Sequence, residues 1–431
     1  MGKLWMMLAV MATLAPIMAQ DSAPAPEATA QETCEIAEKD VDTMMDEYIA
    51  SKGWNEGLNE KNGKKFFVAK GTGVIQAPRE SASYIGSRVN AYNKAMLEAK
   101  KAMVEYLGVD IATETTKEYA EGSAVNPPPP TEGEEVAGKL KKLLISKLNK
   151  TLAEEGIDPV KDPAAARAAL GKQLNSESYK KLITSMAHAK VMGMQAACTF
   201  EGTPKSDKGE IGVVSVWSPK LQSMAASMVT GAPVPKVGAK KPISEQVTSD
   251  PMVLLSTFGV QQRIDENGDL VLVAFGQAGA VSESKMSINA AKGKAKQNAM
   301  AALREFAGEQ VAVASDTLNA ESTAEFEKGA EIYSDESAFR EKIAAVAGKM
   351  NIAGAAPLRN AKAKHPINGK TVTIVALTWN PKQADIARML KMRMENPHVP
   401  NGPKPPAPVV KPPRKPDEFN NCGDGADPDA V

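Results

Sequence analysis

VSVWSPKLQSMAASM, which begins at Val214, and VALTWNPKQADIARML, which begins at Val375, share one order: an apolar strand-like run, a tryptophan, a small polar residue, Pro-Lys and a helix-like pattern. A strand that turns directly into a helix needs a side chain to accept from the free N–H groups of the first turn. Serine and asparagine suit this position, and proline suits the first helical position, where its missing N–H costs nothing. We therefore predict two strand-to-helix corners, formed by Trp217, Ser218 and Pro219 and by Trp379, Asn380 and Pro381.

The tryptophans of the two corners admit two interpretations. We favour a structural role, in which each indole fills the core beneath its corner. The alternative is an exposed indole that stacks on a ligand. Apolar residues follow both corners at helical spacing, which predicts a helix packed on the same core.

A second repeated pattern indicates an internal duplication. Alanines spaced by four, four and three residues place small side chains on one helical stripe, which lets a helix lie close against a sheet. The stripe occurs twice, 200 positions apart, at Ala91, Ala95, Ala99 and Ala102 and at Ala291, Ala295, Ala299 and Ala302. The tryptophans are only 162 positions apart, so the first copy must contain an insertion.

These patterns predict an α+β fold of two related strand-helix-strand domains. We place the first at 61–230, with a helical insertion at 123–178, and the second at 246–395, after a linker at 231–245.

Two further segments are assigned from local composition. VDIATETTKEY, from Val109, and VAVASDTL, from Val311, follow the alanine stripes and are predicted to be β-like because of their β-branched residues. Residues 32–60 form an N-terminal helical segment, whose apolar residues recur at helical spacing over 32–51 and are expected to pack on the first domain.

The N-terminus has the layout of a secretory signal. Lys3 precedes a short apolar run, and polar residues follow. We predict a signal peptide at 1–19, cleaved after Ala19 or Ala15, and a linker at 20–31; the alternative is an uncleaved membrane anchor. The mature protein is thus expected to be soluble and either secreted or periplasmic.

The three cysteines are an odd number for an oxidising compartment. Cys198 lies in apolar sequence and is predicted to be a buried small side chain. Cys34 and Cys422 stand near opposite ends of the mature chain and are candidates for a disulfide, with each other or with another molecule, the alternative being that they stay unpaired. Cys422 belongs to the tail 396–431, which is Pro-rich and then acidic, so this tail is expected to be extended and disordered.

Charge and motif composition argue against several functions. The 52 basic and 52 acidic side chains give no electrostatic reason to expect nucleic acid. The GTG run at 71–73 lacks the third glycine of a dinucleotide loop, and no paired Cys or His spacing predicts a metal site. His188, His365 and His398 have no serine-elbow or Cys-His signature with them. We therefore expect no catalytic site, cofactor or metal.

The helix predicted over 134–155, within the insertion, is a candidate surface for a partner. It combines an apolar stripe with a basic flank formed by Lys139, Lys141, Lys142, Lys147 and Lys150. Such a helix fits an anionic membrane or an envelope protein. We favour the alternative, in which the stripe packs on the first domain while the lysines face water.

GTGVIQAP, from Gly71, followed by SRVNAYNKAMLEAKKAMVEYLG, from Ser87, resembles the bacterial surface-lipoprotein domain of the twenty-kilodalton type and, in layout, the N-terminal domain of the flagellar assembly protein T. The matching positions are Gly71, Gly73, Arg88, Ala91, Ala95, Ala99 and Leu107, with Gly276, Ala291, Ala295 and Ala299 in the second copy. The resemblance covers about a quarter of the chain and implies a small α+β domain in an envelope protein without known catalysis. Here the domain is duplicated, and it lacks the cysteine that accepts a lipid.

The sequence thus predicts a non-catalytic bacterial envelope protein with a binding or structural role. The competing interpretation is a hydrolase-like enzyme with its site between the repeats. A cleft that gathers His188 or His365 with carboxylates and a serine or cysteine would favour the enzyme, whereas a groove without such a set would favour binding.

Overall fold

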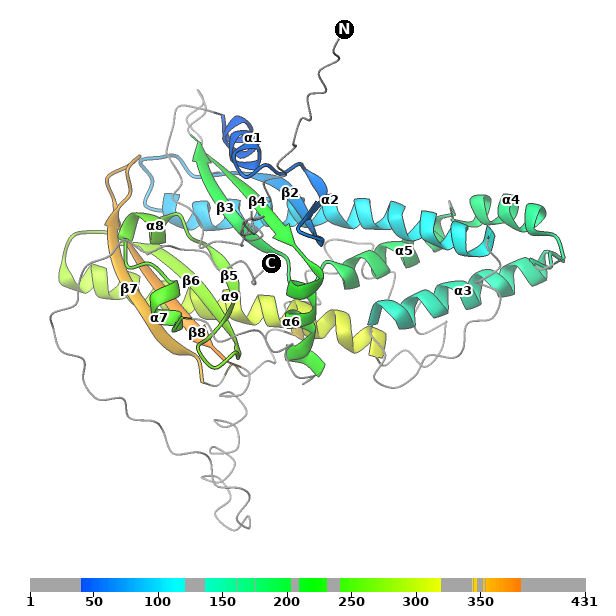
Figure 1. The fold of residues 1–431 in the computed structure, drawn as a ribbon. Helices are drawn as coiled ribbons and strands as arrows, with labels where there is room; N and C mark the ends of the chain where they lie inside the picture. Colours follow the sequence, from blue (N-terminus) through cyan, green and yellow to red (C-terminus); the bar gives the residue numbers. More distant parts are fainter. Residues whose placement is uncertain are drawn as a thin grey trace, which may run out of the picture.

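The part of the chain that the structure describes contains two four-stranded antiparallel sheets, each covered by one long helix (Figure 1). The structure is a computed structural model that describes residues 40–120, 136–159, 161–174, 176–202, 209–230, 241–318 and 354–380, with 343, 345, 346 and 352. The strand order is β1-β2-β4-β3 in sheet A and β5-β6-β8-β7 in sheet B. Each sheet is therefore a pair of hairpins joined through its long helix.

The first repeat is built around sheet A. Its elements are α1 (Val41–Ser51), β1 (Gly57–Lys61), β2 (Lys64–Val74), α2 (Tyr84–Ala120), β3 (Gln195–Gly202), β4 (Glu210–Trp217) and α6 (Pro219–Thr230). Side chains alternate across the sheet, so Phe67 and Ala69 face α2 whereas Phe66 and Val68 face α1. Sheet A is thus covered on both faces.

The second repeat is built in the same way around sheet B. Its elements are α7 (Ile243–Gln246), α8 (Pro251–Leu255), β5 (Gly259–Ile264), β6 (Leu270–Gly279), α9 (Lys285–Leu318), β7 (Ala356–Lys364) and β8 (Thr371–Trp379). Leu272 and Ala274 face α9, whereas Val273 and Phe275 face α7, α8 and the first repeat. The pair α7 and α8 therefore takes the place on sheet B that α1 takes on sheet A.

Strand register shows that the two repeats are related. In each, the tryptophan ends the last strand, opposite Phe67 in sheet A and opposite Leu272 in sheet B. The edge strands β3 and β7 each carry a β-bulge at the equivalent place, after Ala196 and after Pro357. These matches confirm the predicted α+β class with two related strand-helix-strand domains.

The alanine stripes let each long helix approach its sheet backbone to backbone. A Cβ atom on Gly71 would stand 2.0 Å from the carbonyl O of Ala95, and one on Gly276 would stand 2.1 Å from that of Ala295. No larger residue fits either strand position without moving the helix. Strand glycine and helix alanine thus form one packing device, which both repeats use and which the first repeat uses again at Gly73 beside Ala91.

Both long helices extend beyond the predicted ends. The segments from Val109 and Val311 were predicted to be β-like, but they continue α2 to Ala120 and α9 to Leu318. In α2, Ile111, Thr115 and Tyr119 recur every four residues and are buried in one cluster or beside it. Packing on one helical face therefore overrides the local β preference of their side chains.

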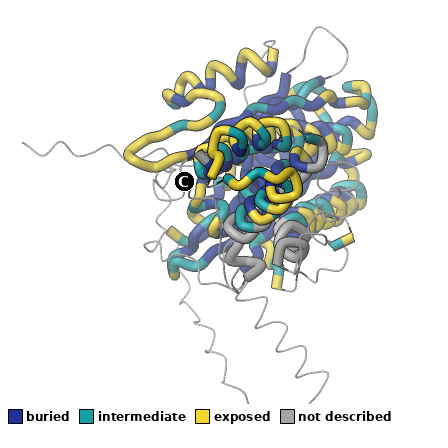
Figure 2. The backbone as a smooth tube through the Cα atoms, turned by 90° about the vertical axis from the view of Figure 1, so that its right-hand side faces the viewer, coloured by how far each residue is buried: buried dark blue, intermediate teal, exposed yellow. Residues whose placement is uncertain are grey.

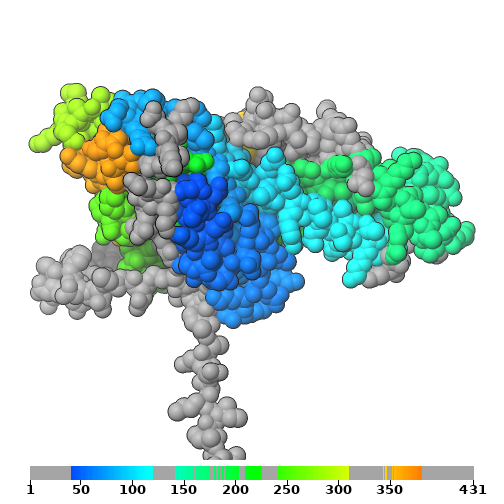
Figure 3. Space-filling view, turned by 90° about the horizontal axis from the view of Figure 1, so that it is seen from above, coloured from blue at the N-terminus to red at the C-terminus, as the bar shows by residue number. Residues whose placement is uncertain are grey.

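The C-terminal half of α2 carries a helical extension that projects from the body of the molecule (Figure 3). It is completed by α3 (Val136–Glu154), α4 (Pro163–Leu174) and α5 (Glu177–Lys190). Leu144, Leu148 and Leu152 of α3 are fully buried in its core. The predicted insertion at 123–178 contains α3 and α4 and the start of α5.

Two predicted boundaries need correction. The N-terminal segment 32–60 is helical only over α1 in its described part, because Gly53 has a positive φ of 66° after the helix end, and β1 then joins sheet A. The predicted linker 231–245 already contains the start of α7, which covers sheet B. The predicted signal peptide, the linker 20–31 and the tail 396–431 lie outside the described residues.

The two repeats share one hydrophobic core. The N-terminal half of α2 contributes Ile85, Ala91 and Tyr92 to a cluster that contains residues of both sheets, among them Val213 of β4 and Val273 of β6. Figure 2 shows buried backbone through the middle of the molecule and exposed residues on its outer helices. Any site between the repeats must therefore lie within a packed interface.

Candidate functional site

A buried polar cluster joins the two repeats. Nε of Arg88, on α2, donates to Oε2 of Glu201, on β3, at 2.5 Å, and its Nη1 donates to Oε1 of Gln277, on β6, at 2.7 Å. Its Nη2 donates to the carbonyl O of Leu255 at 2.9 Å, and the guanidinium carbon lies 4.6 Å from the ring centroid of Phe258. One arginine of the first repeat thus contacts the second repeat at three points.

Glu201 is the central acceptor of this cluster. Its carboxylate also accepts from the hydroxyl of Tyr84 at 3.0 Å and lies 3.2 Å from Nε2 of His365, in the β7–β8 turn. Burial opposes ionisation, but Arg88 and His365 outweigh it and lower the pKa of the Glu201 carboxyl to about 2. Because an ionised carboxylate only accepts, Nε2 of His365 is the donor. Burial and the charge of Glu201 raise the pKa of the Tyr84 hydroxyl.

This cluster lacks the geometry of a hydrolase site. Tyr84, Arg88, Glu201 and His365 are each at most 2% exposed, so a substrate has no path to them. His188 lies apart from the cluster, on α5 near Glu309 and Lys100. The structure therefore brings one predicted histidine together with a carboxylate, in an arrangement that links the repeats rather than opening a cleft between them.

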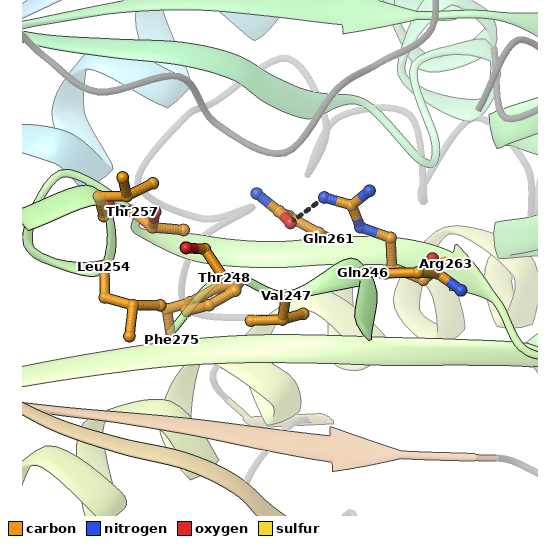
Figure 4. Close-up of a pocket in the computed structure, with 9 residues that line it drawn as sticks. Gln246, Val247, Thr248, Leu254, Thr257, Gln261, Arg263 and Phe275 are labelled. Atoms are coloured by element: carbon orange, nitrogen blue, oxygen red, sulfur yellow. Dashed lines mark hydrogen bonds between the residues drawn. The ribbon is translucent and has the colours of Figure 1, made fainter. Parts of the chain in front are cut away.

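The cavity between α7, α8 and the strands β5 and β6 is small (Figure 4). It measures about 10 Å³, the space of about one water molecule. At its wall, Nη2 of Arg263 donates to Oε1 of Gln261 at 2.8 Å. A cavity of this size holds no organic ligand.

We define the front groove of each repeat as the space between its long helix and one edge strand, on the sheet face that the helix covers. The helix and the strand are α2 and β3 in the first repeat and α9 and β7 in the second. In the first repeat, Val89, Tyr92 and Met96 of α2 line this groove. The ring of Tyr92 stacks on Phe258 of the second repeat, with centroids 4.9 Å apart and planes 15° apart. Val89 and Met96 pack on the same cluster. The second repeat therefore fills the front groove of the first.

None of the described residues fills the front groove of the second repeat. Asn289, Lys292 and Lys296 stand on α9 at the positions of Val89, Tyr92 and Met96, and all three are exposed. The groove measures about 390 Å³, and its lining residues are Asn289, Lys292, Gly293, Lys296, Pro357, Asn360, Val375 and Leu377. Val375 and Leu377 border the groove but are only 2% and 0% exposed, so its accessible lining is the polar, basic rim, which suits an anionic ligand.

The elements around the open groove are strongly basic although the chain as a whole is neutral. Residues 285–304 contain five basic and no acidic side chains, and residues 356–379 contain four basic and none acidic. On β7, Lys362 and Lys364 share the face of Asn360, because side chains alternate along the strand. Within the described part of the chain, none of the lysines at 292, 296, 362 and 364 forms an ion pair.

Comparison with known proteins finds one family model and one solved structure that are similar to this chain. Residues 133–230, from the extension through α6, match a domain of unknown function (DUF6844). A crystal structure at 2.3 Å of a hypothetical protein from Francisella tularensis is similar, with a TM-score of 0.51 and 17% identity over 82% of this chain and 96% of that one. No curated protein matches the sequence. The structural similarity concerns the fold alone.

The predicted corners lie at the ends of the last strands. Trp217 is 9% exposed, and its Nε1 donates to the carbonyl O of Met192 at 3.2 Å. Oγ of Ser218 accepts from the N–H of Leu221 at 3.2 Å, and α6 begins at Pro219. Trp379 and Asn380 are each 7% exposed, and Pro381 lies outside the described residues.

The predicted basic flank of α3 is largely engaged within the extension. Lys141 forms ion pairs with Glu118 and Glu114, and Nζ of Lys147 lies 4.9 Å from the ring centroid of Tyr179. Lys142 is half-buried, Lys150 is exposed, and the side chain of Lys139 lies outside the described residues. The leucine stripe of α3 is buried in the core of the extension, and the described lysines flank this packed helix.

The remaining predicted residues carry no site in the described structure. Cys198 is a buried free thiol, and Cys34, Cys422 and His398 lie outside the described residues. In the described ranges, no group of His, Cys, Asp and Glu is arranged to hold a metal ion. None of the described helices combines the length and apolar character needed to cross a bilayer.

Sequence reasoning missed the open groove. Its basic residues come from a helix and a hairpin that are far apart in the chain, and the balanced total charge concealed them. The absence of acidic residues from 285–304 and from 356–379 is the signal that could have found it. Arg88 was singled out only by resemblance, and nothing local indicated its partners Glu201 and Gln277.

Proposed function

We propose that the protein is a non-catalytic binding protein of the bacterial cell envelope, secreted or periplasmic, and that the front groove of its second repeat binds an anionic partner. One observation carries the proposal: the groove that is filled in the first repeat is basic in the second, and none of the described residues fills it there. Opposite charge across an interface steers association and selects partners. The secretory signal predicted at 1–19 supports the envelope location.

The test is comparative capture from envelope extract with the mature protein and two variants. Lys292→Glu/Lys296→Glu reverses two charges at the groove rim. Lys94→Glu/Lys150→Glu makes the same charge change at exposed lysines of α2 and α3 and is the matched control. We expect components that bind the wild type and the control, that are lost with the groove variant, and that salt releases. Identical capture by all three proteins would refute the groove as the site.

The non-catalytic part of the proposal has its own test. A hydrolase with a site between the repeats would depend on His365, the histidine that contacts a carboxylate there. We expect no hydrolysis of ester, amide or phosphate substrates by the purified protein. Turnover that disappears in His365→Ala, while that variant remains folded by circular dichroism, would establish the enzyme instead.

A further inference from the structure

The open groove is part of a larger surface on the second repeat, which we call the basic face. It comprises Lys285, Met286, Asn289, Lys292 and Lys296 of α9 and Asn360, Lys362 and Lys364 of β7. From Met286 to Lys296 the α9 residues lie at spacings of three, three and four, so they share one stripe of the helix, and Lys285 stands beside its first residue. The β7 residues alternate along the strand and share one side of it. Lysines thus stand on both sides of one groove.

Two unusually exposed apolar residues stand at one end of this face. Val281, in the loop between β6 and α9, is 88% exposed, and Met286, in the first turn of α9, is 84% exposed. Met286 begins the stripe of α9 that leads through Asn289 to the groove. A dissolved acidic peptide would account for the lysines but would leave these two side chains in water. A lipid surface accounts for both, because interfacial binding combines apolar insertion with attraction to anionic headgroups.

We infer that the basic face docks on an anionic lipid bilayer, with Val281 and Met286 entering the interface and the lysines contacting phosphate headgroups. The groove between the two rows of lysines accepts a phosphate headgroup at its polar, basic rim. Attachment through this face is peripheral, since no described helix has the length and apolar character to span a bilayer. This inference rests on the proposed function and names the partner of the same groove.

The test is co-sedimentation of the mature full-length protein with vesicles. One set contains equal parts of phosphatidylglycerol and phosphatidylcholine, and the other contains phosphatidylcholine alone. We expect binding to the anionic set only, and weaker binding at high salt. Lys292→Glu/Lys296→Glu should lower the partition coefficient at least about tenfold. Val281→Asp/Met286→Asp should also lower it, whereas Lys94→Glu/Lys150→Glu should leave it unchanged.

Several outcomes would overturn the inference. Equal binding to both vesicle sets, or binding to neither, removes the anionic bilayer as the partner. Loss of binding in the Lys94→Glu/Lys150→Glu control as well would assign the attraction to general charge or to the extension. Self-association in gel filtration that only the groove variant abolishes would assign the face to a second copy of the chain. If the protein does not bind vesicles while capture from extract still depends on Lys292 and Lys296, the bilayer is excluded as the partner. The proposed function, an anionic partner at the groove, is then retained.

Discussion

The front grooves of the two repeats have the same backbone and opposite surroundings. In the first repeat, Val89, Tyr92 and Met96 line the groove, and Phe258 of the second repeat fills it. In the second repeat, asparagine and two lysines stand at the equivalent helix positions, and the groove stays open in the described structure. The residues at three equivalent positions of α2 and α9 therefore distinguish an internal interface from an exposed binding surface.

This difference explains why the two copies of the domain carry different residues in the same groove. The first copy keeps an apolar groove because it has a permanent occupant in the same chain. Among the described residues no repeat enters the groove of the second copy, and lysines keep this groove hydrated, since an exposed apolar groove of this size would promote unspecific association. The polar cluster around Arg88 and Glu201 then fixes how the repeats meet.

The largest effect on stability is expected when a residue that lines one front groove is replaced by its equivalent from the other. Tyr92→Lys removes a buried ring from Phe258 and places an ammonium group in the shared core. We expect a loss of at least about 4 kcal/mol in the free energy of unfolding, from the lost aromatic contact and the buried charge. Chemical denaturation measures it. The reverse exchange, Lys292→Tyr, should change stability by less than about 0.5 kcal/mol because that site is exposed. Equal effects of the two exchanges would contradict the assignment of filled and open grooves.

Removing the central cation of the inter-repeat cluster should cost nearly as much. Arg88→Ala leaves the carboxylate of Glu201 buried without its main partner, and we expect a loss of about 3 kcal/mol or more. Denaturant unfolding followed by tryptophan fluorescence is the measurement. Lys94→Ala, at an exposed position on the same helix, is the control and should be near neutral. A stable Arg88→Ala protein would show that the cluster does not join the repeats.

Acid should weaken the protein in two steps. Burial is the main cause that lowers the pKa of His188 to about 4, and the nearby charges of Glu309 and Lys100 act in opposite directions. Below about pH 6.5 His188 is protonated in the unfolded chain but stays neutral in the folded protein. The free energy of unfolding therefore falls toward pH 4 by up to about 3 kcal/mol. Glu201 extends the loss from about pH 4.5 to about pH 2, because its carboxyl stays ionised when folded.

Unfolding free energies at pH 7 and pH 4.5 measure the first step. His188→Gln should flatten the change over that interval, whereas Glu201→Gln should leave the His188 contribution in place. An unchanged slope in His188→Gln would assign the acid sensitivity to other groups.

The smallest effect is expected at the capped corner of the first repeat. Ser218→Ala removes the oxygen that accepts from the N–H of Leu221, and we expect a loss of about 1 kcal/mol. Ser218→Asn, which introduces the residue of the second corner, should restore most of it. Thermal unfolding of the two variants beside the wild type decides the point, and equal melting temperatures for Ser218→Ala and the wild type would argue against the cap.

Much of the architecture was predictable because it depends on local patterns. The alanine stripes, the strand glycines and the repeated tryptophan corners report helix and strand periods directly, and they indicated two related α+β domains with an insertion. The same reasoning failed at Val109 and Val311. There the local β preference is real, but α2 is held helical by the burial of Ile111, Thr115 and Tyr119 against the extension.

The sequence by itself determined the helix at each alanine stripe and the glycine-containing strand before it, since those choices depend on neighbours along the chain. Only the tertiary structure decided which side chains from distant segments come into contact. Arg88, Glu201 and His365 come together from three distant segments, and the lysines of α9 and β7 gather along one groove. Whether such side chains are buried, paired or open to a partner depends on which distant element packs against them, and no local pattern encodes that contact.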